Sequence, residues 1–271
     1  MHIQLLISTL NEGILKVGAI ILPQMEDISY LISHQCTSED VPVVPQELMR
    51  NDITIVRMEK GGLSVNRNNC LRHATGDVVV ILDDDVRLKP EYIAAIRNIF
   101  SNNYVEISCC KIRTFPGEPD YKEYPEKHFQ LTNLQQIKAI SSIEIAFRLN
   151  SVRSKGIWFD ERFGLGTSLK SGEEMLFLYE CLKRGISIHY FPEYTVEHHY
   201  QSSGKLTAEY SDERLFITGA QAYALYGRFS FVRNFLAAIK RYKDYKVKGI
   251  TFGHFIRVKQ SGSRYLRCLR S

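Results

Sequence analysis

The chain has 271 residues, of which 44% are hydrophobic and 24% charged, and its formal net charge is +5. This apolar content is typical of globular proteins and excludes a disordered chain, which could not offset the entropy lost on ordering. The charge is unevenly divided. Residues 228–271 hold twelve Lys and Arg against one acid, Asp244, whereas residues 1–227 hold 23 basic and 29 acidic residues. The sequence therefore combines an acidic body with a strongly basic C-terminal segment.

The sequence predicts neither a secretory signal nor a membrane-spanning helix. The first residues lack the basic start and the cleavage site of a signal, and the longest purely aliphatic run, Val78–Leu82, is far shorter than the roughly 20 residues that cross a bilayer. The six cysteines are scattered and form no CxxC pair. We therefore expect free thiols in a reducing cytosol and no zinc site.

Predicted strands and helices alternate over the first hundred residues. Strands are predicted at residues 3–10, 30–33, 53–56 and 78–82, and helices at 14–24, 63–74 and 90–100. The run 78–82 is continuously apolar, which is typical of a strand covered on both faces of a parallel sheet. This order predicts an α/β fold with an open, mostly parallel sheet and helices on both of its faces.

The pattern is less regular after residue 103. Further strands are predicted at 105–112, 143–149 and 186–190, and further helices at about 173–184 and 213–245. A loop rich in Pro and Tyr covers residues 115–125. We predict a catalytic domain over residues 1–205, divided into a nucleotide-binding half at 1–103 and an acceptor-binding half at 104–205. A helical, basic extension follows over 206–271.

Three consecutive carboxylates, Asp83, Asp84 and Asp85, end the apolar run. Like charges this close cannot all be buried in a core, so they need solvent or a cation. They are expected at the carboxyl edge of the sheet, where open α/β proteins bind their ligands. Oxygen ligands suit Mg²⁺ or Mn²⁺, which bridge to substrate phosphates. The alternative is a solvated acidic turn before the helix that Pro90 opens.

The stretch Gly62–Asp85 resembles the Gly-x-Ser-x-x-Arg-Asn…Gly-Asp…Leu-Asp-x-Asp stretch of the family-2 glycosyltransferases with the GT-A fold, of the kind that make bacterial surface polysaccharides. The resemblance extends from residue 3 to about residue 205. It implies an enzyme that moves a sugar from a nucleotide-diphosphate donor to a hydroxyl of a saccharide or lipid-linked saccharide acceptor. The implied reaction depends on Mn²⁺ or Mg²⁺ and inverts the configuration of the sugar.

The resemblance also implies roles for single residues. Asp83 and Asp85 match the Asp-x-Asp pair and are the implied metal ligands, with Asp85 the more direct one. Asp83 or Asp84 is then the acid nearer the ribose. Thr9, at the end of the first strand, matches the position that meets the nucleoside.

Two further donor-site roles follow from the same resemblance. Arg67 matches an arginine that helps to hold the nucleotide, and a cation on the helix surface is the alternative. The family usually has an acid after the second strand that reads the base. Glu39 and Asp40 are the candidates here, and we assign Asp40, although the preceding residues depart from the usual pattern.

A second acidic motif concerns the catalytic base. The segments Phe159–Gly164 and Ser171–Met175 resemble the Phe-Asp-Glu-x-Phe segment of the family and its Glu-Asp motif at a helix start. This sequence has Glu173-Glu174 instead of Glu-Asp. An inverting transfer needs a carboxylate that takes the proton of the acceptor hydroxyl. We prefer Glu174 over Glu173 for this role, and the alternative is that both acids only complement the helix dipole.

The segment Val196–Gly204 resembles a late Val-x-His…Ser segment, in which a histidine completes the metal shell or contacts the diphosphate. His198 fits the spacing better than His199, and a surface histidine is the alternative. Trp158 is a candidate to stack on an acceptor sugar, with core packing as its alternative.

Aromatic residues are interspersed with cations after Arg228. This pattern is typical of segments that lie on an anionic membrane surface. It would place a cytoplasmic enzyme peripherally at the inner face of the cell membrane. A solvated helical extension and an oligomer contact are the alternatives. Nucleic acid is not expected, because no recognisable binding motif accompanies the charge.

Three other function classes account for less of the sequence. A sugar-nucleotide nucleotidyltransferase usually has a Gly-rich basic phosphate loop after its first strand, which Ser8–Gly13 lacks. A haloacid-type phosphatase needs Thr or Val at the position of Arg87. A non-enzymatic basic protein that binds membrane or nucleic acid would account for the C-terminal segment but not for residues 61–85.

Overall fold

The computed structural model describes residues 1–37, 41–59, 61–102, 104–201 and 208–269. The chain divides into two compact units, each described here by itself. The first unit comprises Met1–Glu161 and Glu173–Tyr200, and the second comprises Arg162–Gly172 and Gln201–Ser271.

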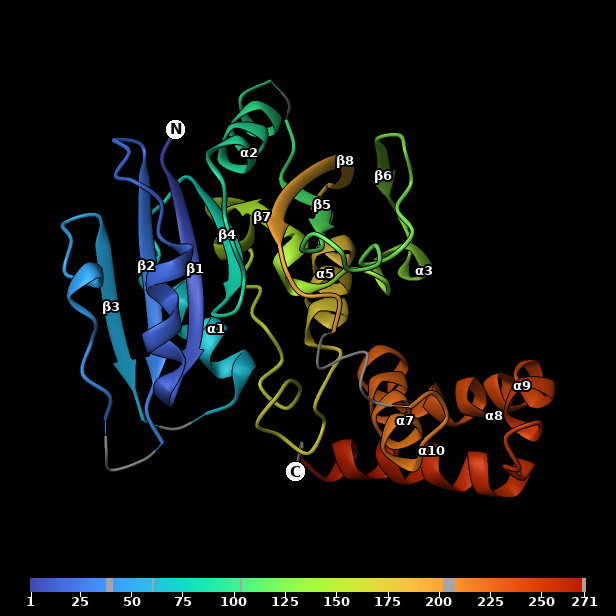
Figure 1. The fold of residues 1–271 in the computed structure, drawn as a ribbon. Helices are drawn as coiled ribbons and strands as arrows, with labels where there is room; N and C mark the ends of the chain where they lie inside the picture. The colour runs from blue at the N-terminus through green and yellow to red at the C-terminus, as the bar shows by residue number, and fades with distance from the viewer. Residues whose placement is uncertain (38–40, 60, 103, 202–207, 270–271) are drawn as a thin grey trace. The chain divides into compact units, whose positions relative to one another are not determined.

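The first unit is built on an eight-stranded sheet with the strand order β3-β2-β1-β4-β7-β5-β8-β6 (Figure 1). The strands are β1 (Ile3–Leu10), β2 (Ile28–Gln35), β3 (Ile53–Met58), β4 (Val78–Asp83), β5 (Ile107–Arg113), β6 (Phe129–Leu131), β7 (Ile145–Arg148) and β8 (Ile188–Glu197). Strands β1 to β4 pair in parallel, as do β5 and β8, whereas β7 and β6 run antiparallel to their neighbours. The predicted mostly parallel α/β fold is confirmed, and β6 is an addition to the predicted strands.

Strand β7 sets the direction of the second half of the sheet. It is antiparallel to both β4 and β5, so β4 and β5 remain parallel to each other. The carboxyl ends of β1, β2, β4, β5 and β8 therefore meet at one edge of the sheet. Ligands of open α/β sheets bind at this edge.

Helices cover both faces of the sheet. On one face lie η1 (Asn11–Ile20) and α2 (Pro90–Asn102), and on the other lie α1 (Leu63–His73) and α5 (Glu173–Lys183) (Figure 1). Successive side chains of β1 point to opposite faces of the sheet, so the strand contributes to the hydrophobic core on each face. Leu5 packs toward η1 and α2, while Leu6 packs toward α1. Shorter helical elements are η2 (Gln46–Leu48), α3 (Leu134–Ile137), η3 (Ser142–Glu144) and α4 (Leu149–Arg153).

The first helix differs from the predicted helix at 14–24. The structure has a 3₁₀ helix that starts earlier, at Asn11, whose φ is 47°. Its buried residues are Ile14, Val17 and Ile20, spaced by three. A spacing of three matches the three residues per turn of a 3₁₀ helix, so this winding buries all three side chains on one face.

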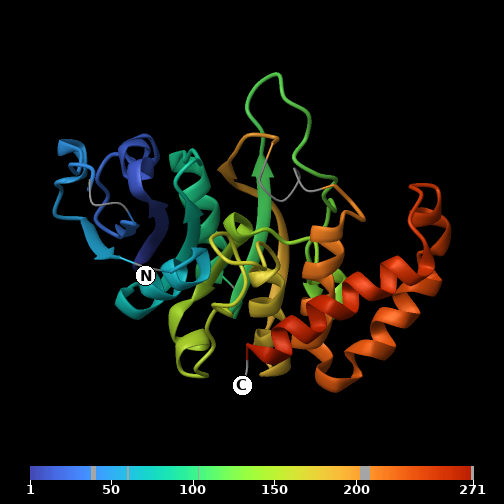
Figure 2. The same cartoon turned by 90° about the horizontal axis from the view of Figure 1, so that it is seen from below.

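The second unit is mostly helical from Asp212 to Cys268, whereas its segment Arg162–Gly172 forms a loop with a bridge between Phe163 and Leu169 (Figure 2). Its elements are α7 (Asp212–Tyr226), η4 (Gly227–Phe229), α8 (Ser230–Lys240), α9 (Tyr242–Lys246) and α10 (Phe252–Cys268). The predicted continuous helix at 213–245 is interrupted at Gly227, which has a φ of 55°. Helices α7 and α10 cross closely, because a Cβ on Gly219 would lie 1.9 Å from the Lys259 carbonyl oxygen. Among the described helices, none is long and apolar enough to cross a membrane.

Candidate active site

Arg67 is a buried residue of α1 that joins the end of β4 to the start of α5. Its guanidinium donates to Asp83 at 2.9 Å, to Glu173 at 3.0 Å and to the Ser142 hydroxyl at 2.8 Å. The side chain is 2% exposed, so the alternative of a surface cation is wrong. Burial opposes its charge, but the carboxylates of Asp83 and Glu173 outweigh burial and raise the pKa of Arg67. Arg67 therefore fixes two of the predicted acids in place.

Asp84 faces the end of β1. Ser8 and Asp83 are in register, so the residues that follow them, Thr9 and Asp84, are also close. The Thr9 hydroxyl donates to Asp84 at 2.5 Å. A Cβ on Gly13 would lie 2.0 Å from the Asp84 carboxylate, so a larger residue would displace Asp84. Burial raises the pKa of Asp84 although the Thr9 hydrogen bond opposes the rise.

Asp85 is the exposed member of the three carboxylates, with 54% of its side chain accessible. Its Oδ1 lies 3.3 Å from Nε2 of His198, which is buried at the end of β8. Nδ1 of His198 lies 2.6 Å from the His199 carbonyl oxygen. Burial opposes a charge on His198, but the hydrogen bonds to Asp85 and to this carbonyl outweigh it and raise the pKa of His198. The hydrogen bond from His198 in turn lowers the pKa of Asp85.

His199 points away from this pair. Its side chain is 63% exposed, and its Nδ1 lies 2.9 Å from the Glu118 carboxylate. The geometry thus brings His198, and not His199, to Asp85.

The side chains of Asp85 and His198 suit a metal ion that takes its other ligands from a bound substrate. Within the described residues, no group of three or more His, Cys, Asp or Glu is placed to hold a metal ion, and Asp83 is engaged by Arg67. Asp85 and His198 offer one oxygen and one nitrogen side by side. The contact of Nδ1 with a backbone carbonyl is the arrangement that orients metal-binding histidines. These two residues fit an Mn²⁺ or Mg²⁺ ion that takes its remaining ligands from water and phosphate oxygens.

The two acids that open α5 differ in access. Glu173 is 3% exposed, and its Oε1 accepts from Arg67, while its Oε2 has no partner among the described residues. Glu174 is partly exposed. Burial, followed by the charge of Glu173, raises the pKa of Glu174 well above that of an ordinary glutamate. An accessible carboxylate with a raised pKa is suited to accept a proton near neutral pH, so Glu174 fits the role of base better than Glu173.

Lys16 of η1 is a site residue that sequence reasoning missed. It is exposed, and its charge lowers the pKa of both Asp84 and Asp85. Residues three apart share a face of a 3₁₀ helix, which places Lys16 one turn beyond Gly13 above the same acids. The spacing Gly13-x-x-Lys16 directly after the first strand is the signal that could have indicated it.

Two further predictions concern residues away from the acids. Glu39 and Asp40, the candidates for the base-reading acid, lie outside the described residues. Trp158 is 40% exposed, and the guanidinium of Arg72 lies 5.6 Å from its ring centroid. The core-packing alternative for Trp158 is therefore wrong, and its stacking on an acceptor sugar stays a prediction.

A cavity of about 760 Å³ lies next to His198. It is lined by the ends of β5 and β8 and by the loop between Thr114 and Glu126. The ring of Tyr121, which lines it, lies 5.9 Å from the His198 ring. Helix η3 connects the cavity with the acids, because Ser142 contacts Arg67 while Glu144 accepts from Lys122 of the cavity wall at 2.5 Å.

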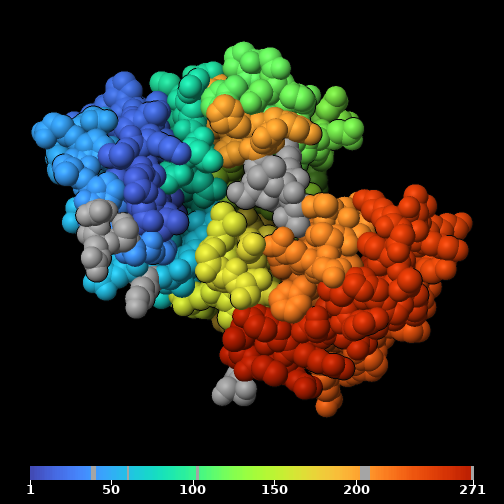
Figure 3. Space-filling view, turned by 60° about the horizontal axis from the view of Figure 1, so that its bottom comes forward, coloured from blue at the N-terminus to red at the C-terminus, as the bar shows by residue number. Residues whose placement is uncertain are grey.

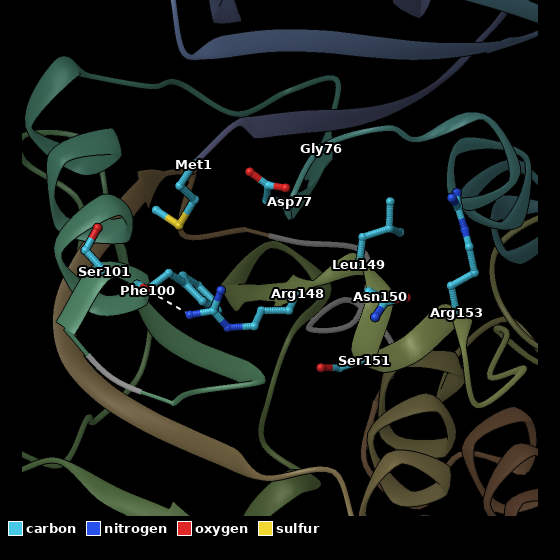
Figure 4. A pocket seen from close by; sticks show the side chains of 10 residues that line it. All are labelled: Met1, Gly76, Asp77, Phe100, Ser101, Arg148, Leu149, Asn150, Ser151 and Arg153. Atoms are coloured by element: carbon cyan, nitrogen blue, oxygen red, sulfur yellow. Dashed lines mark hydrogen bonds between the residues drawn. The ribbon is translucent and has the colours of Figure 1, made fainter.

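A second cavity, of about 590 Å³, lies at the opposite edge of the sheet (Figure 4). It is formed where β1 and β4 begin and β7 ends, and Arg148 there donates to the Phe100 carbonyl at 2.7 Å. Its lining contains no predicted site residue. This cavity therefore adds nothing to the candidate site at the carboxyl edge.

Comparison with solved structures identifies the fold. The chain superposes on the crystal structure of S. aureus TarS 1–349 with a TM-score of 0.62 and 14% sequence identity, over 99% of this chain and 92% of that one. The structure of TarS 1–349 in complex with UDP-GlcNAc gives a TM-score of 0.59 and 15% identity, over 84% and 67% of the two chains. The fold is thus of the GT-A type, as the sequence predicted.

Sequence comparison identifies the family. No protein of curated function matches the sequence significantly. Residues 27–168, more than half of the chain, match the family model described as Glycosyl transferase family 2. This match covers Arg67 and all three carboxylates after β4. The protein therefore belongs to glycosyl transferase family 2.

Proposed function

We propose that this glycosyltransferase moves a sugar from a nucleoside-diphosphate donor to a hydroxyl of a saccharide or lipid-linked saccharide, with inversion and with Mn²⁺ or Mg²⁺ as cofactor. The observation that carries the proposal is the Asp85–His198 pair, which presents an oxygen and a nitrogen donor at the carboxyl edge of the sheet. TarS was crystallised with UDP-GlcNAc and with UDP, which makes a uridine-diphosphate sugar the first donor to test here.

The donor site would use the residues around the end of β1. Thr9 and Asp84, which are hydrogen-bonded to each other, would contact the nucleoside. Asp85 and His198 would hold the cation, which neutralises the departing diphosphate when bound. Lys16 adds a positive charge on the same side and would contact the diphosphate. Arg67 acts through Asp83 and Glu173, so it is a positioning residue.

The transfer itself needs one proton acceptor. Glu174 would take the proton of the acceptor hydroxyl while the hydroxyl oxygen forms a bond to the anomeric carbon of the donor. The bond from this carbon to the diphosphate oxygen breaks, and the diphosphate leaves with the electron pair. Attack from the side opposite to the leaving group inverts the configuration. Glu174 then releases the proton to water.

The acceptor would enter through the 760 Å³ cavity beside His198. Aromatic rings of Tyr121, Tyr124 and Tyr194 line this cavity, and rings of this kind pack against sugars. The contacts of Ser142 and Glu144 hold the cavity wall and the acids through one short helix. These contacts support the proposal that the cavity receives the acceptor.

UDP together with Mn²⁺ should raise the melting temperature of the protein more than either one alone. A ligand at 100 times its dissociation constant adds about 2.7 kcal/mol to the free energy of unfolding. For a chain of this size that corresponds to a rise of roughly 5–10 °C. The measurement is a thermal-shift screen of nucleoside diphosphates and sugar nucleotides, with and without Mn²⁺.

The variant Asp85→Asn should lose the part of the shift that depends on Mn²⁺. The matched control is Asp77→Asn, since Asp77 immediately precedes β4 at the other end of the strand. An undiminished Mn²⁺ effect in Asp85→Asn would reject the assignment of the cation site. If no nucleoside diphosphate stabilises the protein under either condition, the proposed donor class is wrong.

Lys16→Gln should weaken the binding of UDP by roughly three- to tenfold, which corresponds to about 0.7–1.4 kcal/mol. The affinity for UMP should change less, because UMP lacks the second phosphate. Isothermal titration with both nucleotides checks this. The control is Lys183→Gln, an exposed lysine at the end of α5. Equal losses for UDP and UMP would contradict a contact with the diphosphate.

A further inference from the structure

Helix α8 buries its polar and small side chains and exposes its apolar ones. Ser230, Asn234 and Ala238 are 4%, 0% and 0% exposed, and Asn234 donates to the Ser263 hydroxyl of α10 at 3.0 Å. The exposed apolar side chains, each 38–59% accessible, are Phe231, Val232, Phe235, Leu236 and Ile239. This is the reverse of the usual distribution in a surface helix.

The exposed apolar side chains form one continuous face. Phe231, Phe235 and Ile239 are four residues apart, and Val232 and Leu236 lie next to them, so all five project from the same side of the helix. We call these five residues the α8 apolar face. Phe229 precedes it and Tyr242 follows it, and both are also exposed. A contiguous exposed apolar face of this kind marks a surface that binds a partner.

Exposed cations lie on α8 and next to it along the chain. Arg233 and Lys240 lie on α8 itself and are exposed. Further exposed cations before and after the helix are Arg228, Arg241, Lys243, Lys246 and Lys248. The one acid from residue 228 onward is Asp244. The partner of this face is therefore expected to be both apolar and negatively charged.

A second copy of the chain does not meet this requirement. A twofold interface places the same patch of each copy against the other, so it would bring the cations of both copies together, with Asp244, already paired with Arg241, as the one acid of this segment. An anionic bilayer is both apolar and negatively charged, because its acyl chains accept the apolar side chains while its headgroups carry the countercharge.

In the space-filling view the helices of the second unit form a continuous surface, coloured orange to red (Figure 3).

We infer that α8 lies in the headgroup region of an anionic membrane, with the α8 apolar face directed into the acyl chains. Amphipathic helices with basic borders bind membranes in this orientation. The inference goes beyond the proposed function, because it concerns where the enzyme is held and not the reaction that it performs.

Cosedimentation with vesicles tests the inference. The full chain should bind vesicles of phosphatidylglycerol and phosphatidylcholine, and bind vesicles of phosphatidylcholine alone far less. Phe231→Ser combined with Ile239→Ser should reduce the partition coefficient on the anionic vesicles roughly tenfold or more. The matched control is Val43→Ser with Met49→Ser, two apolar residues of the first unit that are 85% and 60% exposed. The control should change the coefficient by less than about twofold.

Charge variants and oligomer measurements separate the alternatives. Arg233→Gln with Lys240→Gln should weaken binding to anionic vesicles several-fold and make it less sensitive to salt. Circular dichroism of each variant should show the same helical signal as the wild type, as a check that it is folded. Equal binding by the wild type and the Phe231/Ile239 variant would overturn the inference. So would an oligomer that forms without lipid and dissociates in this variant, because the face would then join copies of the chain. No nucleotide is needed, so the result is independent of the proposed reaction.

Discussion

Replacing Glu174 with glutamine should lower the rate of sugar transfer by about 10²- to 10⁴-fold, the usual contribution of a general base. Glutamine has nearly the same shape but cannot accept the proton of the acceptor hydroxyl. Binding of UDP should change by less than about twofold, because the donor site is formed by other residues. Release of UDP from UDP-GlcNAc measures the first effect, and titration with UDP the second.

Neighbouring substitutions sharpen this test. Glu174→Asp should retain part of the activity, because it keeps a carboxylate and restores the acid that the family motif has at this position. Glu173→Gln should act through Arg67 and lower the stability of the protein, since Glu173 accepts from Arg67 at 3.0 Å. If Glu173→Gln loses transfer while it stays folded and Glu174→Gln remains active, Glu173 is the base and our assignment is wrong.

The rate should also depend on pH in a direction set by Glu174. Burial and the charge of Glu173 raise the pKa of Glu174, so its carboxylate form is populated at a higher pH than for an ordinary glutamate. Only the carboxylate can act as base, so kcat should rise with pH across the neutral range. A rate that is already constant from pH 5 upward would contradict this assignment.

Arg67→Met should cost about 3–5 kcal/mol of unfolding free energy, since it leaves Glu173 as an unpaired buried carboxylate and removes the partner of Asp83. Burial of Glu173 is what makes the loss large, because a carboxylate in the interior cannot regain its hydration. Urea denaturation followed by circular dichroism measures the change.

Arg72→Met is the matched control, because Arg72 lies on the same helix and pairs with Glu161 at 3.4 Å, but its side chain is 51% exposed. An exposed pair of this kind contributes about 1 kcal/mol or less. Adding Glu173→Gln to Arg67→Met should recover part of the stability, since it removes one of the orphaned charges. If Arg67→Met and Arg72→Met lower the unfolding free energy equally, Arg67 does not make the predicted contribution to stability.

The sequence was sufficient to predict elements with a local signal. The continuous apolar run before Asp83 indicated a buried parallel strand, and β4 ends at Asp83. The helix predicted at 63–74 is α1, Leu63–His73. Both depend on patterns within a few turns of chain, where the periodicity of burial directly reflects the secondary structure.

Features that depend on contacts between distant segments could not be predicted. Arg67 has no sequence feature that indicates its two acidic partners, one of which lies 106 residues away. The different environments of Asp83, Asp84 and Asp85 arise from α1, β1 and β8, which a motif of three identical residues does not reveal. The apolar face of α8 was likewise hidden, because the period of a helix shows which residues share a face but not which face is buried.

The Arg67 bridge also bears on how enzymes of this kind diversify. One guanidinium binds both Asp83 and Glu173, so the two ends of the chain segment between these residues are held close together. The loop of residues 114–126, which borders the cavity, lies within this span. A segment with anchored ends tolerates insertions and substitutions at small entropic cost. Descendants of such a protein could therefore acquire new acceptors by changing this loop while the acidic residues around Arg67 stay as they are.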